Sequence, residues 1–487
     1  MTQHFFEAGP WADMPVGDMD PWAPMRAWAA SLDWAARMAA VRWTRAGGRP
    51  AIEAVCRERL RTLVDFARAH SGFYRKAYRG VAPAVRSVGE LPVVGKRELM
   101  THFDEWVTDP RITRRRLEAF LADRGHIGER FLGRYLVWKS SGTSGEPGLF
   151  VQDPNALATY DALASLQLQT MGMAMRYGWG LLAQGGRAAL ITATGDHYAG
   201  IASWRRTHRQ VPWIEARSYS VLDPLASLVE QLNAYQPAFL ASYPTALLLL
   251  AGERKAGRLR ISPATLWSYG EGLTAAALAE IESAFGCPVE NEYGASECLS
   301  IAYGCREGWL HVNADWVLLE PVDADYLPTA PGEPSHTVLL TNLANLVQPV
   351  IRYDLGDSVI LKRTPCACGD ALPAIQVEGR RDDLLSRRAA DGRAVTLLPA
   401  AITSVIEAAA GLRRFQIVQK GAELLTLRLG ERDAGDRQAI LRRVSGALNV
   451  YLAAQGLGNV RVELEETLPA AAPRSGKVRQ VIVESRD

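Results

Sequence analysis

The sequence predicts an α/β protein in which a large, helix-covered domain precedes a smaller α+β domain. Its 487 residues, 48% of them apolar, are too many for one ordinary core and suit one large plus one smaller domain. Between residues 186 and 294, apolar strand patterns alternate with helical patterns, which is typical of a largely parallel sheet covered by helices. Past Gly379 the pattern changes to a hairpin, an amphipathic helix and a further strand, which predicts a separate small domain.

Composition excludes several classes of protein. The 55 basic and 53 acidic side chains leave a formal charge of +2, which argues against a strongly basic nucleic-acid-binding protein. The large apolar fraction argues against disorder, and no apolar run reaches the roughly 20 residues of a membrane span. The N-terminus lacks a signal-peptide pattern, and the six cysteines form no disulfide framework. We therefore expect a cytoplasmic protein with neither nucleic acid nor a membrane as partner; a homodimer is one option, and the sequence leaves the oligomeric state open.

The first fifty residues are rich in tryptophan and differ in character from the rest of the chain. A polar, proline-containing stretch leads into a helical pattern over 24–45, and the tryptophans are Trp11, Trp22, Trp28, Trp34 and Trp43. We expect this arm, residues 1–50, to pack onto the main body; the alternative is a segment that binds a partner. A second helical pattern over 51–70 opens the large domain, which we place at 51–378.

Three stretches in the middle of the chain predict alternating strands and helices. Residues 186–196 predict a buried strand that runs into a Gly-Asp loop, and 238–257 predict a strand, a proline-marked turn and a helix. Residues 265–294 predict strand, helix and strand, with Thr274 as the helix N-cap and Gly286 as its stop. Because ligands of parallel α/β sheets bind beyond the carboxyl ends of the strands, we expect a site in the loops at those ends.

The small domain is predicted to cover 379–487. Residues 414–430 predict a hairpin with a glycine turn, 436–456 an amphipathic helix, and 460–468 another strand. A polar run that begins at 380–383 predicts the hinge between the two domains.

The strongest local signal is a serine- and glycine-rich loop directly after the apolar run 135–138. Its glycines allow tight turns that bring backbone N–H groups close to an anion, and its hydroxyls can donate to phosphate oxygens. It lacks the Gly-Lys-Ser/Thr ending of a Walker loop, and alone it is more typical of an ordinary turn. Its residues are Ser140, Ser141, Gly142, Thr143, Ser144, Gly145, Glu146 and Pro147.

Four further motifs come after this loop in order. They are the runs Tyr293–Glu297 (YGASE), Arg352–Asp357 (RYDLGD), Gly379–Asp383 (GRRDD) and Pro473–Lys477 (PRSGK). In this order and spacing, the five motifs resemble the adenylate-forming superfamily of acyl-CoA synthetases, firefly luciferase and peptide-synthetase adenylation domains. Two features are most similar to the phenylacetate–CoA ligase family. They are the amino-acid sequences of the serine loop and of residues 341–357, and the short C-terminal domain. The similarity covers roughly residues 60–484 and leaves out the N-terminal arm.

The resemblance implies activation of a carboxylate by ATP: a carboxylate oxygen attacks the α-phosphorus and pyrophosphate leaves. Negative charge must then be neutralised on both sides of that phosphorus. The resemblance assigns the loop from Ser140 to Gly145 to the departing phosphates and Glu297 to Mg²⁺, although a carboxylate that caps the next segment is the alternative for Glu297. It assigns adenine, ribose and α-phosphate to Gly270, Glu271, Gly272, Tyr293, Gly294, Ser296, Asp357 and Arg380.

Lys477 is the residue that the resemblance assigns to the first half-reaction. It is one of seven lysines in an arginine-rich chain, and its Ser-Gly-Lys context favours a mobile point charge over an ordinary surface lysine. The resemblance also implies that the small domain rotates after adenylation, with Asp382 at the hinge. That rotation would withdraw Lys477 and admit a thiol.

The acid is expected beside the loop at the end of the strand predicted in residues 186–196. His197 and Tyr198 align with the segment beside the acyl carboxylate in relatives, so the histidine could donate a hydrogen bond to an acyl oxygen. A loop histidine without a catalytic role is the alternative. Tyr243 and Pro244 are expected to form a pocket wall, or only a turn, and Gly294 is expected to contact the substrate.

Four residues predict a metal site: Cys305, His311, Cys366 and Cys368. Three thiolates and one imidazole complete a tetrahedral zinc site without an open position, so such a metal would be structural. Some phenylacetate–CoA ligase relatives show a similar arrangement. Cys-x-Cys is less diagnostic than Cys-x-x-Cys, and reduced buried cysteines are the alternative.

We therefore predict an ATP- and Mg²⁺-dependent acid–thiol ligase that forms an acyl-adenylate and then an acyl thioester with coenzyme A. An aromatic or arylacetic acid is the substrate class on the resemblance alone. One alternative keeps the adenylation but passes the acyl group to a carrier-protein phosphopantetheine or to an amine. A second alternative is a non-catalytic interaction protein with this fold. Residues 387–390 depart from the pattern of relatives where their thiol tunnel forms, which leaves the acceptor open.

Overall fold

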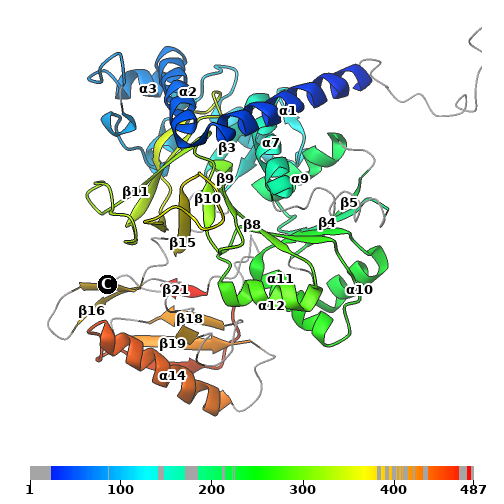
Figure 1. Ribbon diagram of the computed structural model, residues 1–487, viewed down its shortest axis with the longest axis vertical. Coiled ribbons are helices and arrows are strands. Elements are labelled where there is room, and N and C mark those ends of the chain that lie inside the picture. The colour runs from blue at the N-terminus through cyan, green and yellow to red at the C-terminus, as the bar shows by residue number, and fades with distance from the viewer. Residues whose placement is uncertain are drawn as a thin grey trace, which may run out of the picture.

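The described part of the computed structural model is built around a mixed sheet of nine strands with helices on both faces (Figure 1). A smaller α+β unit comes after it in the chain, which confirms the predicted fold class. The structure describes residues 23–85, 87–140, 147–170, 185–210, 214–221, 223, 225–380, 385–389, 394–397, 402, 405–406, 409, 415–420, 423–430, 437–470 and 480–483.

The central sheet has a parallel half and an antiparallel half. Its order is β14-β15-β10-β9-β8-β7-β6-β4-β5, and the strands from β8 to β5 in this order are parallel. The inner strands β4, β6 and β7 are buried on both faces, which explains why the sequence reads as apolar runs there. The strands are β4 (Arg187–Thr192), β5 (Glu215–Ser220), β6 (Phe239–Ser242), β7 (Thr265–Tyr269), β8 (Val289–Ala295), β9 (Cys298–Gly304), β10 (Leu310–Val312), β14 (Asp357–Leu361) and β15 (Ala374–Arg380).

Helices cover both faces of the parallel half (Figure 1). On one face, Ile201 and Trp204 of α9 pack in one apolar cluster with Trp267 of β7. On the other face, Ile281 of α12 packs with Leu266, the neighbour of Trp267 in the same strand. This alternation results from the period of two in a strand, which sends successive side chains to opposite faces. The helices are α7 (Pro154–Thr170), α9 (Ala199–Gln210), α10 (Leu225–Tyr235), α11 (Pro244–Lys255) and α12 (Ala275–Phe285).

The predicted boundaries of α12 are confirmed. The Thr274 side chain accepts a hydrogen bond from the backbone N–H of Ala277, which satisfies one of the unpaired donors of the first turn. Gly286 ends the helix with φ at +68°, in the left-handed region that a residue without Cβ adopts at little cost.

Two three-stranded antiparallel sheets and a group of short helices complete the large unit. The sheets are β1 (Arg130–Phe131), β2 (Tyr135–Lys139) and β3 (Leu149–Gln152), and β11 (Val317–Val322), β12 (Thr337–Asn342) and β13 (Val350–Asp354). The helices are α2 (Gly48–His70), α3 (Gly72–Ala77), η1 (Val88–Glu90), α4 (Lys96–Thr101), α5 (Phe103–Trp106), α6 (Arg114–Ala122) and η2 (Arg124–His126). They share one large apolar core with the antiparallel half of the central sheet.

The N-terminal arm enters the structure as α1 (Ala23–Ala46), which lies along α7 (Figure 1). Met38 and Val41 of α1 are buried in one cluster with Leu163 and Leu166 of α7. This packing agrees with the expectation that the arm rests on the main body. Trp43 faces away from it, with 84% of its surface exposed.

The small unit has its own sheet and its own core. Its sheet order is β20-β19-β18-β21, with β18 and β19 antiparallel as the hairpin prediction required. The predicted helix is α14, and β21 adds a strand that the sequence pattern did not indicate. The elements are β16 (Leu385–Arg388), β17 (Ala394–Leu397), β18 (Phe415–Gln419), β19 (Leu424–Leu429), α14 (Arg437–Ala454), β20 (Arg461–Glu465) and β21 (Val481–Val483). Among the described helices of the whole chain, none combines the length and the apolar character needed to cross a bilayer.

Candidate functional site

Most of the described residues predicted for the site come directly after strands that end at one edge of the central sheet. Strands β4, β6, β7 and β8 are parallel, so their carboxyl ends meet at the same edge. Tyr243 comes directly after β6, Gly270 comes after β7, and Tyr293 stands near the end of β8. His197 lies five residues beyond the last residue of β4. This edge is where parallel α/β sheets bind their ligands.

The ends of the serine-glycine loop are held together at the turn end of the β2–β3 hairpin. The Ser140 N–H donates to the Gly148 carbonyl at 2.9 Å, and the Ser140 hydroxyl accepts from the Gly148 N–H at 2.8 Å. Trp138 Nε1 donates to the Ser296 carbonyl at 2.8 Å, which ties the hairpin to the turn after β8. The remaining predicted loop residues, Ser141, Gly142, Thr143, Ser144 and Gly145, lie outside the described residues.

The turn between β8 and β9 carries Glu297, the predicted ligand of Mg²⁺. Only 8% of Glu297 is exposed, and its carbonyl oxygen accepts from the Asn342 side-chain amide at 3.0 Å. Gly294 allows the turn to close, because a Cβ at that position would lie 1.9 Å from the Leu299 carbonyl oxygen. The serine loop and Glu297 are thus brought to one place by the bond between Trp138 and Ser296.

Tyr293 and Asp357, predicted for adenine and ribose, are in direct contact. The Tyr293 hydroxyl donates to Asp357 Oδ2 at 2.6 Å. Asp357 is 8% exposed and begins β14, where it pairs in register with Arg380 of β15. Residues 64 positions apart therefore converge at the predicted nucleotide side of the sheet edge.

The turn 270–272, predicted to approach the adenine ring, comes after β7 at the same edge. Glu271 is already engaged there: its Oε2 accepts from the Thr245 hydroxyl at 2.7 Å and lies 3.3 Å from the Thr245 N–H. This carboxylate therefore holds the first turn of α11, where unpaired backbone N–H groups favour a negative charge.

His197 is completely buried and held by its backbone and its ring. Its carbonyl accepts from the Lys139 N–H at 2.7 Å, and ring Nε2 lies 2.9 Å from the Asp123 carbonyl. A carbonyl only accepts, so Nε2 carries the proton and Nδ1 is an acceptor without a partner among the described residues. Burial lowers the pKa of His197, which favours this neutral ring. The ring as it lies donates to Asp123 and leaves Nδ1 as an acceptor, and the predicted hydrogen bond to an acyl oxygen stays a prediction.

Tyr243 and Tyr269 form an aromatic pair at the ends of β6 and β7. Their ring centroids are 5.3 Å apart, and the Tyr243 hydroxyl lies 3.1 Å from Thr192 Oγ1. Burial raises the pKa of Tyr243, so it stays a neutral phenol. Pro244 occupies the first position of α11, where its missing N–H costs nothing. Tyr198 packs against the same aromatic cluster as Tyr269.

An ion pair between Lys139 and Asp196 joins the serine loop to the His197 loop, and the sequence reading missed it. Lys139 Nζ lies 2.8 Å from Asp196 Oδ1. Burial disfavours the charged carboxylate, but hydrogen bonds from Lys139 and the His197 N–H outweigh it and keep the pKa of Asp196 below its ordinary value. The sequence did contain a signal for this residue: Lys139 is one of only seven lysines, and it directly precedes the serine-glycine loop.

Two predicted residues of the small unit, Lys477 and Asp382, lie outside the described residues. Arg380 ends β15, and its backbone pairing with Asp357 is all that the structure describes of it.

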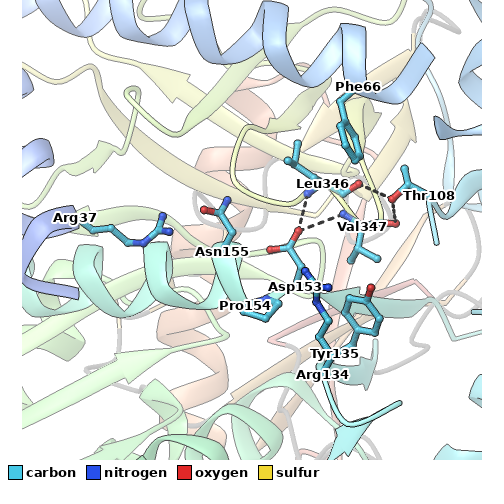
Figure 2. A pocket seen from close by; sticks show the side chains of 10 residues that line it. All are labelled: Arg37, Phe66, Thr108, Arg134, Tyr135, Asp153, Pro154, Asn155, Leu346 and Val347. Carbon is cyan, nitrogen blue, oxygen red and sulfur yellow. Dashed lines mark hydrogen bonds between the residues drawn. The ribbon is translucent and has the colours of Figure 1, made fainter. Parts of the chain in front are cut away.

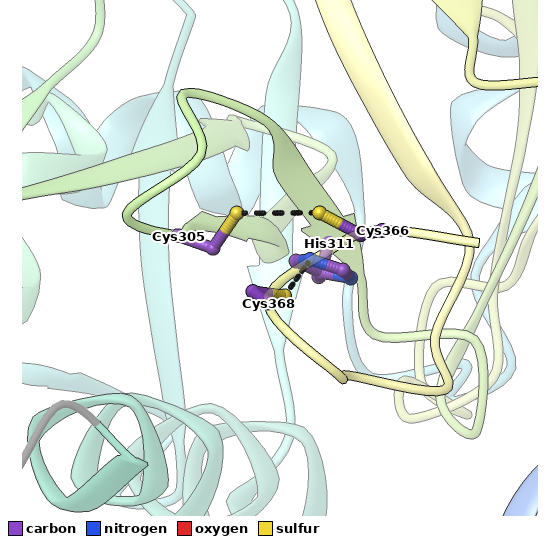
Figure 3. Close-up of side chains that lie close together, drawn as sticks. All are labelled: Cys305, His311, Cys366 and Cys368. Carbon is purple, nitrogen blue, oxygen red and sulfur yellow. Dashed lines mark hydrogen bonds between the residues drawn. The ribbon is translucent and has the colours of Figure 1, made fainter. Parts of the chain in front are cut away.

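The four predicted metal ligands form one cluster (Figure 3). Their ligand atoms lie within 4.8 Å of one another, with Cys305 Sγ 3.8 Å from Cys366 Sγ and Cys368 Sγ 3.1 Å from His311 Nε2. Two sulfurs bound at about 2.3 Å to a tetrahedral zinc lie roughly 3.8 Å apart, so the spacing fits that ion. Ring Nδ1 of His311 lies 3.0 Å from the Leu372 carbonyl, which leaves Nε2 unprotonated and able to coordinate a metal.

The cluster of three cysteines and His311 lies beneath the junction of α1 and α2. The Tyr303 hydroxyl donates to Asp370, two residues after Cys368, and the Tyr303 ring packs with Ile52 of α2. The guanidinium carbon of Arg45 is 5.8 Å from the centroid of that ring.

Arg45 also anchors the end of α1 to the turn after β10. It donates to Asn313 Oδ1 at 2.8 Å and to Asp315 Oδ1 at 3.0 Å. Arg45 and Asp315 are therefore a second pair of residues that the sequence reading did not find.

A cavity of about 480 Å³ lies between α1, α2 and the start of α7, away from the carboxyl ends of the parallel strands (Figure 2). The Asp153 carboxylate within it is engaged by the backbone N–H groups of Leu346 and Val347, at 3.0 and 3.3 Å. None of its lining residues was predicted for the site. They are Arg37, Phe66, Thr108, Arg134, Tyr135, Asp153, Pro154, Asn155, Leu346 and Val347.

The structure is similar to that of a 2-hydroxyisobutyryl-CoA ligase in its postadenylation state with 2-HIB-AMP. The TM-score is 0.65 at 20% sequence identity, over 90% of each chain. An open conformation of that ligase with 2-HIB-AMP and CoA matches with a TM-score of 0.53 at 20% identity, over 90% of this chain and 91% of the other.

In sequence, 136 residues are 29% identical to protein CapK of Staphylococcus aureus. They make up 28% of this chain, and the match spans 29% of the length of CapK. No family model matches the chain. At these identities, the structural likeness establishes the fold.

Proposed function

We propose that the protein is an ATP- and Mg²⁺-dependent ligase that joins a carboxylic acid to AMP and then transfers the acyl group to a thiol. The observation that carries this proposal is the contact between Tyr293 and Asp357 at the sheet edge, beside the serine loop and Glu297. Further support comes from the five motifs in order and from the likeness of the fold to a ligase solved with an acyl-AMP and CoA.

The first half-reaction forms a bond between a carboxylate oxygen of the acid and the α-phosphorus of ATP. The bond from that phosphorus to the bridging oxygen breaks, and pyrophosphate leaves with its electron pair. The loop beginning at Ser140 donates N–H and O–H groups to the leaving phosphates, and Glu297 holds Mg²⁺, which supplies positive charge against them. Lys477 brings a further positive charge between the acid and the α-phosphate.

The nucleoside is held by Tyr293 and Asp357. A carboxylate has about four acceptor positions, so Asp357 can accept the ribose hydroxyls as well as the Tyr293 hydroxyl. That hydrogen bond also holds the Tyr293 hydroxyl beside Asp357, and the ring offers its face to adenine together with the turn at Gly270. Arg380, paired with Asp357 across the two strands, lies at the side of the ribose and α-phosphate.

In the second half-reaction, a thiol sulfur attacks the acyl carbon, AMP leaves, and the thiol proton passes to solvent. The small domain rotates about Asp382 between the two steps and removes Lys477 from the site. Coenzyme A is the proposed acceptor, and the resemblance favours an aromatic or arylacetic acid. A carrier-protein phosphopantetheine or an amine is the alternative acceptor, and formation of free acyl-CoA separates these cases.

The proposed metal at Cys305, His311, Cys366 and Cys368 is a structural zinc ion. Three sulfurs and one imidazole nitrogen leave no coordination position for a substrate, and the cluster stands on the antiparallel half of the sheet. Bound there, the ion would hold the 366–372 loop against β10.

The proposal is tested by pyrophosphate release that depends on a carboxylic acid. Purified protein is given ATP and Mg²⁺ with benzoic, arylacetic, heteroaromatic or aliphatic acids, with and without coenzyme A. At least one acid should release pyrophosphate above the acid-free rate, and coenzyme A should convert it to a thioester. Absence of release with every acid, in protein that does not bind ATP, would contradict the proposed function.

A further inference from the structure

Strand β8 carries two carboxyl side chains, Glu290 and Glu292, on the face that α7 and α9 cover. They are two residues apart, so they point to the same side of the sheet. The register of β7 and β8 pairs Glu290 with Trp267 and Glu292 with Tyr269, and paired residues share a face. Trp267 and Tyr269 belong to the aromatic cluster that also includes Tyr198.

Glu292 is held in one orientation by two donors. The Ser300 hydroxyl donates to Oε1 at 2.8 Å and the Trp267 indole N–H donates to Oε2 at 3.1 Å. These bonds use about half of the acceptor capacity of a carboxylate. The side chain is only partly buried, so the remaining acceptor positions can meet a ligand.

Glu290 lies deeper and is less well satisfied. It is completely buried, its Oε2 is 3.4 Å from the Gln167 side-chain amide, and its Oε1 has no hydrogen-bond partner among the described residues. Neither Glu290 nor Glu292 takes part in an ion pair between described residues, and burial raises the pKa of each to about 7. A buried carboxyl oxygen without a hydrogen bond destabilises the fold, and a donor on a bound ligand would remove that cost.

The position of this pair fits the far end of an acid that is activated at the sheet edge. A strand rises about 3.3 Å per residue, so Glu290 lies roughly 10 Å along β8 from Tyr293. The same layer contains a second buried polar atom without a described partner, Nδ1 of His197, at the start of the segment that leads into α9. An acid whose carboxylate lies at the edge would therefore extend along this face, past Tyr269, toward Glu292 and Glu290.

Resting on the proposed function, we propose that Glu290 and Glu292 form the far wall of the acid-binding site. This wall selects an acid that carries a hydrogen-bond-donating group, an amine or a hydroxyl, remote from the carboxylate that is activated. A donor on the acid would hydrogen-bond to the free acceptor positions and favour the ionised form of each carboxyl group, which only accepts. A second carboxylate on the substrate offers no donor and would oppose the ionisation of both groups, so the wall selects against it.

The test compares acids of one size that differ in a single group. Pyrophosphate release is measured for benzoic acids with a 4-amino, 4-hydroxyl, 4-methyl or 4-carboxyl group, and for the matching phenylacetic acids. The best donor-bearing acid should exceed its methyl analogue at least about tenfold in kcat/KM, because a buried polar wall rejects a ligand that leaves it unpaired. The amino and hydroxyl arms identify the donor.

The two proposals fail differently in this experiment. If neither these acids nor the wider panel releases pyrophosphate, and the protein does not bind ATP, the proposed function itself is contradicted. If the methyl or the dicarboxylic analogues react as well as the donor-bearing acids, the ligase proposal stands and the selecting wall is overturned.

Substitutions then assign the selectivity to the two residues. Glu290→Gln and Glu292→Gln keep the shape and change the acceptor, and each should reduce the donor-to-methyl ratio at least about tenfold while the methyl analogue changes less than about threefold. Glu280→Gln is the matched control, because Glu280 pairs with Lys255 at 2.9 Å and belongs to α12 on the opposite face. Its ratio should stay at the wild-type value.

Thermal melting establishes that each variant is folded before its kinetics are compared. Should Glu290→Gln fail to fold, Glu292→Gln alone decides the matter, because its side chain is less buried. An unchanged ratio in the folded variants would overturn the proposal.

Discussion

The hydroxyl of Tyr293 donates to Asp357 at 2.6 Å, and the proposed nucleotide site depends on this contact. The strand β8 supplies the tyrosine and β14 the aspartate, from opposite halves of the central sheet. A hydrogen bond to an ionised partner orders both side chains more firmly than a neutral one would. Removing the hydroxyl should therefore loosen the ribose carboxylate without removing the ring that faces adenine.

Tyr293→Phe should raise the KM for ATP in pyrophosphate release by about fivefold, which corresponds to a hydrogen bond of about 1 kcal/mol. Tyr135→Phe is the matched control, since the Tyr135 hydroxyl donates to Asp109 Oδ2 at 2.8 Å near the remote cavity. Its KM for ATP should equal that of the wild type. Equal effects of both variants would mean that the hydrogen bond near β14 has no role in nucleotide binding.

Residues of the proposed site divide into those that belong to a recognisable sequence motif and those that do not. Ser140, Tyr293 and Asp357 could be predicted because each belongs to a motif whose order carries information. Gln167 and Glu290 could not, because 123 residues separate them and neither stands in a motif. The acceptor state of His197 was likewise invisible, since it depends on a carbonyl at Asp123, 74 residues earlier.

At the level of elements, the cluster of three cysteines and His311 is connected to the N-terminal helices through shared contacts. His311 stands on β10, Asp370 comes after the two loop cysteines, and the Tyr303 ring between them packs against Ile52 of α2. Ligands fixed by a metal also fix the residues that hydrogen-bond to their loop. Zinc occupancy and the docking of the α1–α2 junction should therefore be coupled.

Purified protein should contain about one zinc per chain, and removing it with a chelator should speed amide hydrogen exchange in 366–372 and at the α1–α2 junction around Arg45. The amides of α14 serve as the internal control, because that helix packs in the separate core of the small unit. Cys368→Ser should reproduce the effect of the chelator. A metal-free protein with unchanged exchange would dispose of both the zinc site and the coupling.

The pairing of β19 with β20 carries a pH-dependent stabilisation. Hydrogen bonds from Arg428 are the main cause that lowers the pKa of Glu465 from 4.5 to about 2. A carboxyl group with a depressed folded pKa stabilises the fold fully above its unfolded pKa and loses that contribution as the pH falls through the folded value. The contribution of Glu465 is therefore present at neutral pH and disappears between about pH 4.5 and pH 2.

Glu465→Gln should lower the melting temperature of the small unit by a few degrees at neutral pH, and the difference from the wild type should shrink as the pH approaches about 2. Glu463→Gln, an exposed neighbour on the same strand, is the control and should leave the melting temperature unchanged. A difference that persists at the lowest pH would assign the effect to packing instead of charge. Circular dichroism melts across this pH range supply the measurement.

Elements with a strong local period were predictable, and those that depend on distant pairing were not. The helix α12 has its cap, its apolar face and its stop within 13 consecutive residues, so its sequence suffices to define it. The sheet of β11, β12 and β13 has short strands whose partners lie across loops of seven or more residues. Nothing in their local pattern distinguishes such strands from buried loop segments.

At the scale of the whole molecule, the described residues contain at least two separate cores. The buried cluster of the small unit draws all its members from residues 385–481, and no residue of the large unit belongs to it. A unit with its own core can change its position without exposing apolar surface of its own. This division makes the proposed rotation physically inexpensive, and it places Lys477 on the part of the chain that would move.

Lys477→Ala should abolish acid-dependent pyrophosphate release while sparing thioester formation from a supplied acyl-adenylate, because only the first step needs a positive charge at the α-phosphate. Lys420→Ala is the matched control, since Lys420 belongs to the same unit and pairs with Glu465 at 3.2 Å on its surface. Both of its half-reactions should proceed at wild-type rates. Thioester formation is monitored separately with a chemically prepared acyl-AMP, so that the two steps do not share a substrate. If Lys477→Ala lost both steps to the same extent, the lysine would serve one fixed arrangement of the two units, and rotation between the half-reactions would be refuted.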